Sequence, residues 1–227
     1  MITFDIETYK DVSDDNYVAW KTAGISAPSN YKDPEKIAQN IADQKVDMLN
    51  KFALSPLTGK IILIGCLIDK QPELPFEFTK YNIAGKDVFY TAFDDEEKDM
   101  LTKFWMLVGW NNLQLGGDML SFNGKAFDLP FLLNRSAILD VKPPMKISMQ
   151  KHLSKYQHQP HLDLYNWFGS GSLVEWSYRF GISSSLQRDG DKIGGWYEAN
   201  QMNLIKDKNM IDLAQTNAIY QRIKDWL

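Results

Sequence analysis

Residues 2–7, ITFDIE, alternate between apolar and polar side chains. Alternation of this kind is typical of a β-strand with one face in the core, because successive side chains point to opposite faces. The three apolar residues are therefore expected to face the interior. Asp5 and Glu7 share the opposite face, about 7 Å apart along the backbone at a rise of ~3.3 Å per residue.

Two carboxylates side by side on such a strand repel each other unless a cation neutralises them. The ordinary alternative is an exposed strand edge whose acids are solvated. Two further acids, distant in the sequence, favour the cation.

One of these acids follows a second expected strand. SFNGKAFDLP, residues 121–130, is interpreted as a strand end, a turn and a helix start, with Asp128 near the helix N-terminus. Acids are common there, because the N-terminal end of a helix carries a partial positive charge. The other acid, Asp212, shares one helical face with Thr216, Ile219 and Ile223. An acid on an apolar stripe is out of place in a simple amphipathic helix, so we expect Asp212 to be directed at a ligand.

The hydrophobic pattern predicts strands mostly early and helices mostly late in the chain. Expected strands cover 2–7, 60–68, 76–81, 88–93 and 119–122, and expected helices cover 34–54, 94–111, 127–139, 173–180 and 203–226. Residues 9–33 and 183–195 are expected to be loops. This order predicts an α/β or α+β fold with a mixed sheet. We expect a single domain over residues 1–227, with a helical insertion at about 11–58 in which Asp33 caps the helix.

The composition is that of a globular protein, with 44% hydrophobic and 24% charged residues among 227. The longest apolar run, residues 61–68, is too short to span a membrane. No signal peptide is recognised at the start, and the single cysteine, Cys66, is expected to be a buried apolar residue, so a cytoplasmic location is the default. The net charge of −4 argues weakly against nucleic-acid binding. If four acids bind metal ions, however, 25 basic and 25 acidic residues remain.

Three segments carry a resemblance to a known family. They are FDIET at 4–8, FNGKAFDLP at 122–130, and Asp212 followed by Thr216. They resemble the exonuclease motifs of the DEDD family of 3′–5′ exonucleases, the DnaQ-like group, and within it a phage and bacterial subgroup related to the proofreading domains of family B polymerases. The resemblance extends over most of the chain, including TGKIILIG at 58–65 and HLDL at 161–164. It implies an RNase H-like α/β fold, with a mixed central sheet of about five strands flanked by helices.

The resemblance implies a metal-dependent 3′–5′ exonuclease that hydrolyses single-stranded nucleic acid, DNA rather than RNA, to nucleoside 5′-monophosphates. Matched motif by motif, Asp5, Glu7, Asp128 and Asp212 would bind two divalent cations, Mg²⁺ or Mn²⁺, which prefer oxygen ligands. Two metals ~3.5–4 Å apart can hold both the attacking and the leaving oxygen of an in-line displacement. The partners would be nucleic-acid 3′ ends, together with replication or repair proteins.

Residues flanking the matched acids would bind the substrate: Ile6, Thr8, Asn123 and Phe127. Asp163 matches an acid that this subgroup often carries between its second and third motifs, and it would support substrate binding. The alternative for Asp163 is a loop acid that caps a nearby backbone group.

The third motif departs from the family pattern. The family places a tyrosine four residues before the acid or a histidine five before it, whereas this chain has Lys208 and Asp207. A protonated lysine donates hydrogen bonds but accepts none, so it cannot deprotonate water. We therefore expect Lys208 to be a catalytic residue that contacts the scissile or an adjacent phosphate, with the water activated by metal alone. Alternatively, Lys208 is solvated, or it marks a catalytically impaired protein that binds nucleic acid or a replication partner. An RNase H-like endonuclease is disfavoured by the order of the acids.

Two other signals are weaker. His152, His158 and His161 have no cysteine partner and fit no familiar zinc spacing. Trp196 and Tyr197 follow two glycines in an expected loop and are candidates for substrate contact.

Overall fold

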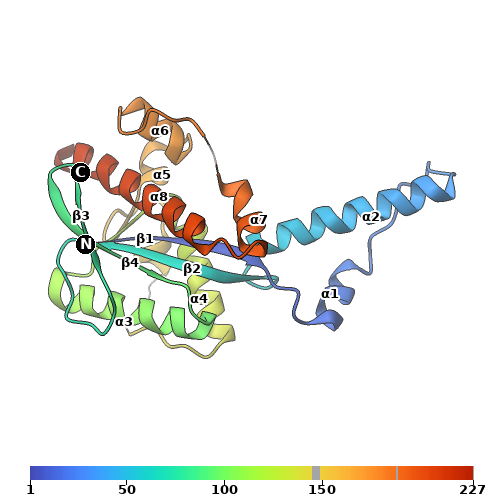
Figure 1. Ribbon diagram of the computed structural model, residues 1–227, viewed down its shortest axis with the longest axis horizontal. Helices are drawn as coiled ribbons and strands as arrows, with labels where there is room; N and C mark the ends of the chain where they lie inside the picture. The colour runs from blue at the N-terminus through green and yellow to red at the C-terminus, as the bar shows by residue number, and fades with distance from the viewer. Residues whose placement is uncertain (145–148, 188, 227) are drawn as a thin grey trace. The chain divides into compact units, whose positions relative to one another are not determined.

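The computed structural model describes residues 1–144, 149–187 and 189–226 (Figure 1). The chain forms two compact units, Met1–Glu7 with Ile61–Leu227, and Thr8–Lys60. The first unit is built on a six-stranded sheet in the order β3-β4-β2-β1-β5-β6. The strands are β1 (Ile2–Lys10), β2 (Gly59–Ile68), β3 (Thr79–Ile83), β4 (Lys86–Phe93), β5 (Met119–Ser121) and β6 (His161–Asp163).

The sheet is mixed, which confirms the predicted fold class. β1 runs parallel to β5, and β5 runs parallel to β6, whereas β4 is antiparallel to both β2 and β3. The sixth strand, β6, was not expected. Its three residues, His161–Asp163, include a single apolar one, so the sequence offers no hydrophobic run there that would indicate a strand.

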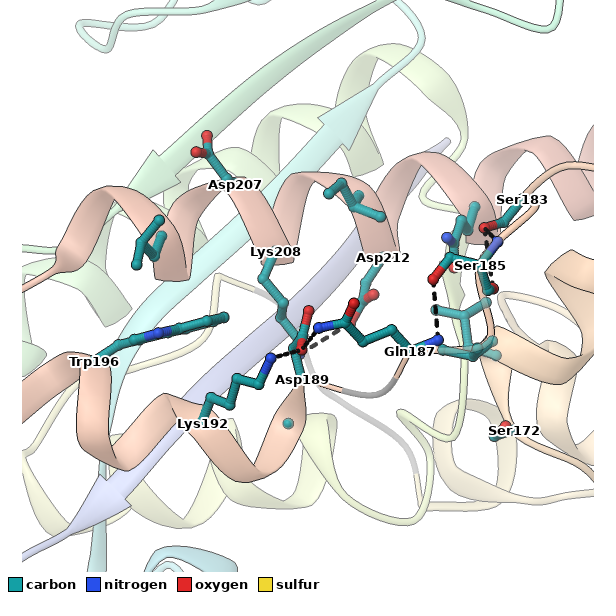
Figure 2. Close-up of a pocket in the computed structure, with 16 residues that line it drawn as sticks. Ser172, Ser183, Ser185, Gln187, Asp189, Lys192, Trp196, Asp207, Lys208 and Asp212 are labelled. Carbon is teal, nitrogen blue, oxygen red and sulfur yellow. Dashed lines mark hydrogen bonds and ion pairs between the residues drawn. The ribbon is translucent and has the colours of Figure 1, made fainter.

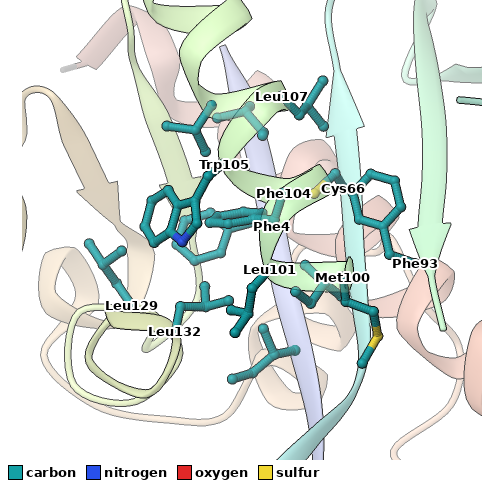
Figure 3. Packing of buried hydrophobic residues seen from close by; sticks show 14 of the residues in the cluster. Phe4, Cys66, Phe93, Met100, Leu101, Phe104, Trp105, Leu107, Leu129 and Leu132 are labelled. Atoms are coloured by element: carbon teal, nitrogen blue, oxygen red, sulfur yellow. The ribbon is translucent and has the colours of Figure 1, made fainter. Parts of the chain in front are cut away.

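Helices cover both faces of this sheet. They are α3 (Glu97–Leu115), α4 (Asp128–Ile138), α5 (Leu164–Phe168), α6 (Leu173–Arg179), α7 (Ile193–Glu198) and α8 (Met202–Ile223). The main core joins β1 and β2 to α3 and α4, with Phe4 packed near Phe104 at its centre (Figure 3). On the other face, α8 contributes Leu213 to one apolar cluster and Ile219 and Ile223 to another.

The two faces of β1 differ in character, as the alternation predicts. Phe4 and Ile6 are buried in the core against α3 and α4. The opposite face is polar and meets polar side chains of α8. Asn217 Nδ2 lies 3.4 Å from Thr3 Oγ1, and further along the strand α8 also contacts Asp5 and Glu7. The strand is therefore buried on both sides, with its acids toward α8.

An ion pair fastens α3 and α4 to the sheet. Arg135 donates to both carboxylate oxygens of Glu97, at 2.8 and 2.6 Å, and Glu97 also accepts the amide of Ile61 at 2.8 Å. Glu97 is the first residue of α3, where the helix dipole favours an acid, and the ion pair adds a specific contact to that favourable position.

The second unit contains α1 (Asp15–Thr22), α2 (Pro34–Lys51) and the 3₁₀ turn Phe52–Leu54. The cap of α2 was predicted, and Asp33 accepts the amide of Glu35. Helix α1 lies in the expected loop 9–33. None of its residues is buried, so no apolar stripe identifies it, and the capping residue Asp14 is its main local signal.

The other expected loop, residues 183–195, also contains helical structure. A 3₁₀ turn, Gly190–Lys192, leads into α7. Two glycines in that helix weaken its sequence signal, while the buried side chain of Ile193 anchors it. Among the described residues, none of the helices has the length and hydropathy that a membrane span requires.

Candidate metal and active site

Three of the four predicted acids form a compact group between β1 and α8. Ligand oxygens of Asp5, Glu7 and Asp212 all lie within 4.8 Å of one another. Asp5 and Glu7 share the polar face of β1, and Asp212 faces them from the middle of α8. Carboxylates from two elements thus meet, although more than 200 residues separate them in the chain.

The fourth acid, Asp128, is the first residue of α4 and is 4% exposed. Its Oδ1 accepts the backbone amide of Ile6 at 3.0 Å. This amide is available because β5 pairs with β1 only near Ile2 and Thr3. Asp128 therefore binds the edge of β1 just beyond the end of its neighbouring strand and beside Asp5 and Glu7.

The charges of these acids are poorly compensated by the protein. Burial raises the pKa of Asp128 to about 7, opposing the hydrogen bond from Ile6. Burial also raises the pKa of Asp5 well above its ordinary value, and the negative charges of Asp128 and Glu7 raise it further. Grouped carboxylates with raised pKa values gain stability from a bound cation. An all-oxygen donor set suits Mg²⁺ or Mn²⁺, so the residues present fit the expected ions.

Lys208 points into the acid group. Its Nζ donates to Glu7 Oε1 at 2.7 Å and to Asp212 Oδ2 at 2.9 Å. Burial lowers the pKa of Lys208, but the surrounding carboxylates outweigh that effect and hold it above the ordinary value. The side chain is 19% exposed, and the ammonium is charged. Lys208 is therefore not the solvated surface residue that we considered as an alternative.

Asn209 was not predicted from the sequence to be a site residue. This residue is fully buried on α8, and its Nδ2 donates to Asp5 Oδ2 at 2.8 Å, which orients the carboxylate. Gly65 of β2 makes room for it, because a Cβ at Gly65 would overlap the Asn209 amide. A signal was present in the sequence: Asn209 lies three residues before Asp212, on the same side of the helix.

Asp163 accepts hydrogen bonds from backbone amides of two segments, the loop after β5 and the start of α5. It accepts from Asn123 at 2.7 Å and Lys125 at 2.9 Å, and it caps α5 through the amide of Tyr165 at 3.0 Å. The loop that follows β5 is thereby tied to β6. Lys125 also connects this loop to the segment before β6, because its Nζ donates to the carbonyl of Ser154 at 2.8 Å. These are the capping contacts that we considered as the alternative role of Asp163.

The other predicted substrate-binding residues lie in different settings. The Ile6 side chain is in the core, so only its backbone borders the acids. The Phe127 ring packs 5.5 Å from that of Phe131, at the edge of the same core. Asn123, in a left-handed conformation, lines a shallow pocket with Phe122 and Tyr165. In the second unit, Thr8 donates its hydroxyl to the carbonyl of Ala53 at 2.7 Å.

A pocket of about 650 Å³ opens beside the acid group (Figure 2). Lys208 and Asp212 line one side, and the indole of Trp196 forms part of another. The rest of the lining mixes apolar residues of α6 and α8 with polar residues of 183–192. The volume is typical of small-ligand sites. Trp196 thus lines the same pocket as Lys208 and Asp212, whereas Tyr197 does not line it.

The histidines show no metal-binding arrangement in the described part of the chain, where none joins a group of potential ligands. His161 is fully buried, and its ring nitrogens pair with Ser121 Oγ at 2.8 Å and the His152 carbonyl at 2.9 Å. Burial lowers its pKa to about 3. His161 is therefore a neutral structural residue.

A mixed sheet carrying a group of four neighbouring carboxylates defines an α/β protein with a candidate cation site. Comparison with protein families then identifies it further. The model of a family described as predicted 3′–5′ exonucleases related to the exonuclease domain of PolB matches residues 57–226. The match includes Asp128, Lys208 and Asp212 but begins after Asp5 and Glu7. The chain belongs to this family.

The solved structures support the same fold. The chain is similar to the family B DNA polymerase of the hyperthermophilic archaeon Pyrobaculum calidifontis, with a TM-score of 0.53 and 14% identity. The similarity covers 98% of this chain but 24% of the polymerase, so the chain spans about a quarter of that protein's length. No curated protein matches the chain.

Proposed function

We propose that this chain is a metal-dependent 3′–5′ exonuclease that acts on single-stranded ends, DNA rather than RNA, and releases nucleoside 5′-monophosphates. The main support is that ligand oxygens of Asp5, Glu7 and Asp212 lie within 4.8 Å of one another. The chain also belongs to a family of predicted exonucleases. Single-stranded 3′ ends are the proposed partner, and replication or repair proteins are further candidates. We propose that residues 1–227 act as one exonuclease domain with an insertion at about 11–58, working in the cytoplasm.

In the proposed mechanism, Asp5, Glu7, Asp128 and Asp212 hold two divalent cations, Mg²⁺ or Mn²⁺. When bound, such ions activate a water and stabilise the charge that develops on the phosphate. Asn209 holds the Asp5 carboxylate in place through its 2.8 Å hydrogen bond. The amide of Ile6 does the same for Asp128 at 3.0 Å.

Lys208 has a separate proposed role. Its ammonium has hydrogen atoms to donate and no lone pair to accept a proton. It would therefore donate to a phosphate oxygen beside the scissile bond rather than deprotonate water. Binding of the terminal nucleotide would use Ile6, Thr8, Asn123 and Phe127, while Asp163 keeps the loop of Asn123 in position.

A second function is favoured by one observation. Lys208 forms ion pairs with carboxylate oxygens of both Glu7 and Asp212. It therefore competes with metal ions for those oxygens. If Lys208 keeps metal ions from binding these oxygens, the protein would bind nucleic acid or a replication partner without hydrolysing nucleic acid.

Hydrolysis of a 5′-labelled single-stranded oligonucleotide separates the two functions. The exonuclease predicts a ladder of shortened products with Mn²⁺ or Mg²⁺, none with EDTA, and at least a 100-fold loss of rate in Asp5→Asn and Asp212→Asn. Asp225→Asn removes an exposed acid just beyond α8 and should leave the rate unchanged. A mobility shift without shortening, in the presence of Mn²⁺, would support the binding function instead.

A further inference from the structure

The position of Lys208 suggests how this site is regulated. Its Nζ lies 2.7 Å from Glu7 Oε1 and 2.9 Å from Asp212 Oδ2. The carboxylates are themselves 7% and 22% exposed, so water screens the contacts only partly. The ammonium therefore acts as the counter-ion of the group in the protein without metal.

The same carboxylates are the candidate ligands for divalent cations. Glu7 and Asp212 both belong to the group whose ligand oxygens lie within 4.8 Å of one another. An oxygen that accepts a hydrogen bond from an ammonium has a reduced capacity to bind a metal ion. The ammonium and an incoming cation also repel each other at such distances.

We propose that Lys208 is a built-in counter-ion that takes the place of one of the two cations, and that it leaves the acids for a substrate phosphate when the second cation binds. This inference rests on the proposed exonuclease function and assigns Lys208 a part in the binding of its cations. The free protein holds one divalent ion tightly, and the second ion enters together with nucleotide.

Formal charges support this order. With all four acids ionised, one divalent cation and Lys208 leave a net charge of minus one. A second divalent cation, with Lys208 still nearby, changes it to plus one. A phosphodiester then restores neutrality and offers the displaced ammonium an acceptor.

The structure provides space for the movement. Lys208 lines the 650 Å³ pocket next to Asp212 (Figure 2). The lysine side chain has a flexible four-carbon stem, so its ammonium can turn from the carboxylates toward the pocket without a shift of α8. A phosphate held beside the acids would lie within its reach.

The test counts bound Mn²⁺ ions by isothermal titration calorimetry and by the electron paramagnetic resonance signal of free Mn²⁺. Without nucleotide, the wild type should bind one ion tightly and a second at least about tenfold more weakly, and thymidine 5′-monophosphate should strengthen the second by about tenfold. Lys208→Met should bind both ions without nucleotide and lose the nucleotide effect.

Two further variants keep the result interpretable. Lys206→Met removes a lysine on the same helix that pairs with Asp94 at 2.8 Å, and it should behave as the wild type. Lys208→Gln keeps a hydrogen-bond donor without the charge, and it replaces Lys208→Met if that variant fails to fold.

The inference is overturned if Lys208 variants bind Mn²⁺ with the wild-type number and affinities, or if the wild type binds two ions equally well without nucleotide. Both outcomes are compatible with oligonucleotide hydrolysis and leave the proposed function intact. Absence of any Mn²⁺ binding in the wild type would overturn both proposals.

Discussion

Replacing Gly65 by alanine tests how β2 and α8 build the acid site. A Cβ at this position would overlap the Asn209 amide and reach 3.0 Å from Leu213 Cδ1. Overpacking a buried site of this kind costs about 1–3 kcal/mol. Loss of the Asn209 amide, which donates to a carboxylate, costs about 1.5–3 kcal/mol on its own. If the two changes were independent, Gly65→Ala with Asn209→Ala would therefore lose about 2.5–6 kcal/mol of stability.

The structure predicts strong coupling instead. Asn209→Ala removes the two closest atoms that an added methyl group would strike and leaves only Leu213 Cδ1, the end of a flexible side chain, so the double variant should lose little more stability than Asn209→Ala alone. Urea denaturation of the wild type, both single variants and the double variant measures this coupling, which should be at least about 1 kcal/mol. Gly24→Ala, where nothing lies within 4 Å of an added Cβ, is the control. Additive losses within about 0.5 kcal/mol would refute the close approach of α8 to β2 at Gly65.

Other predictions concern stability. His161 has a pKa lowered to about 3 from 6.5, so the folded state stays neutral while the unfolded state takes up a proton. As the pH falls below 6.5, the free energy of unfolding of the wild type should decrease by up to about 1.4 kcal/mol per pH unit relative to that of His161→Gln. Denaturation of both proteins from pH 7 to 4 measures this difference, and parallel pH profiles would contradict the prediction. Arg135→Met leaves the partly buried Glu97 without its ion-pair partner and should cost up to about 3–5 kcal/mol of stability, against at most about 1 kcal/mol for Lys103→Met at a more exposed ion pair. Equal losses would argue against the role of the Arg135–Glu97 pair in holding α3 and α4 to the sheet. A divalent cation at 100 times its Kd should stabilise the protein by about 2.7 kcal/mol. Asp212→Asn should lose most of this stabilisation, as measured by thermal melts. If the variant were stabilised as much as the wild type, the ion would bind elsewhere.

The sequence was most informative where side-chain periodicity was strong. The alternation in residues 2–7 correctly predicted a strand with Phe4 and Ile6 in the core and two acids opposite. The mixed sheet and the main helices followed from similar patterns. These patterns show which side of a strand or helix is buried. The packing of helices on the sheet requires such an apolar side, so the patterns predict the elements well.

Features that depend on tertiary contacts were not predictable in this way. The spacing of Asn209 from Asp212 places both on one side of the helix, but it does not identify Asn209 as the residue that orients Asp5, and Gly65 has meaning only opposite Asn209. Lys208 was noticed because it departs from a motif, but its contacts with both Glu7 and Asp212 required the geometry of α8 against β1. The exposed helix α1 lacked an apolar stripe and was missed for that reason.

We propose that carboxylates from β1, α4 and α8 form one cation site. Crystals soaked with Mn²⁺ and thymidine 5′-monophosphate, measured for anomalous scattering, test it most directly. The account predicts anomalous peaks bonded to oxygens of Asp5 and Asp212, with Glu7 and Asp128 around the same ions. Fully occupied Mn²⁺ peaks elsewhere in the molecule, with none at Asp5 and Asp212, would contradict it.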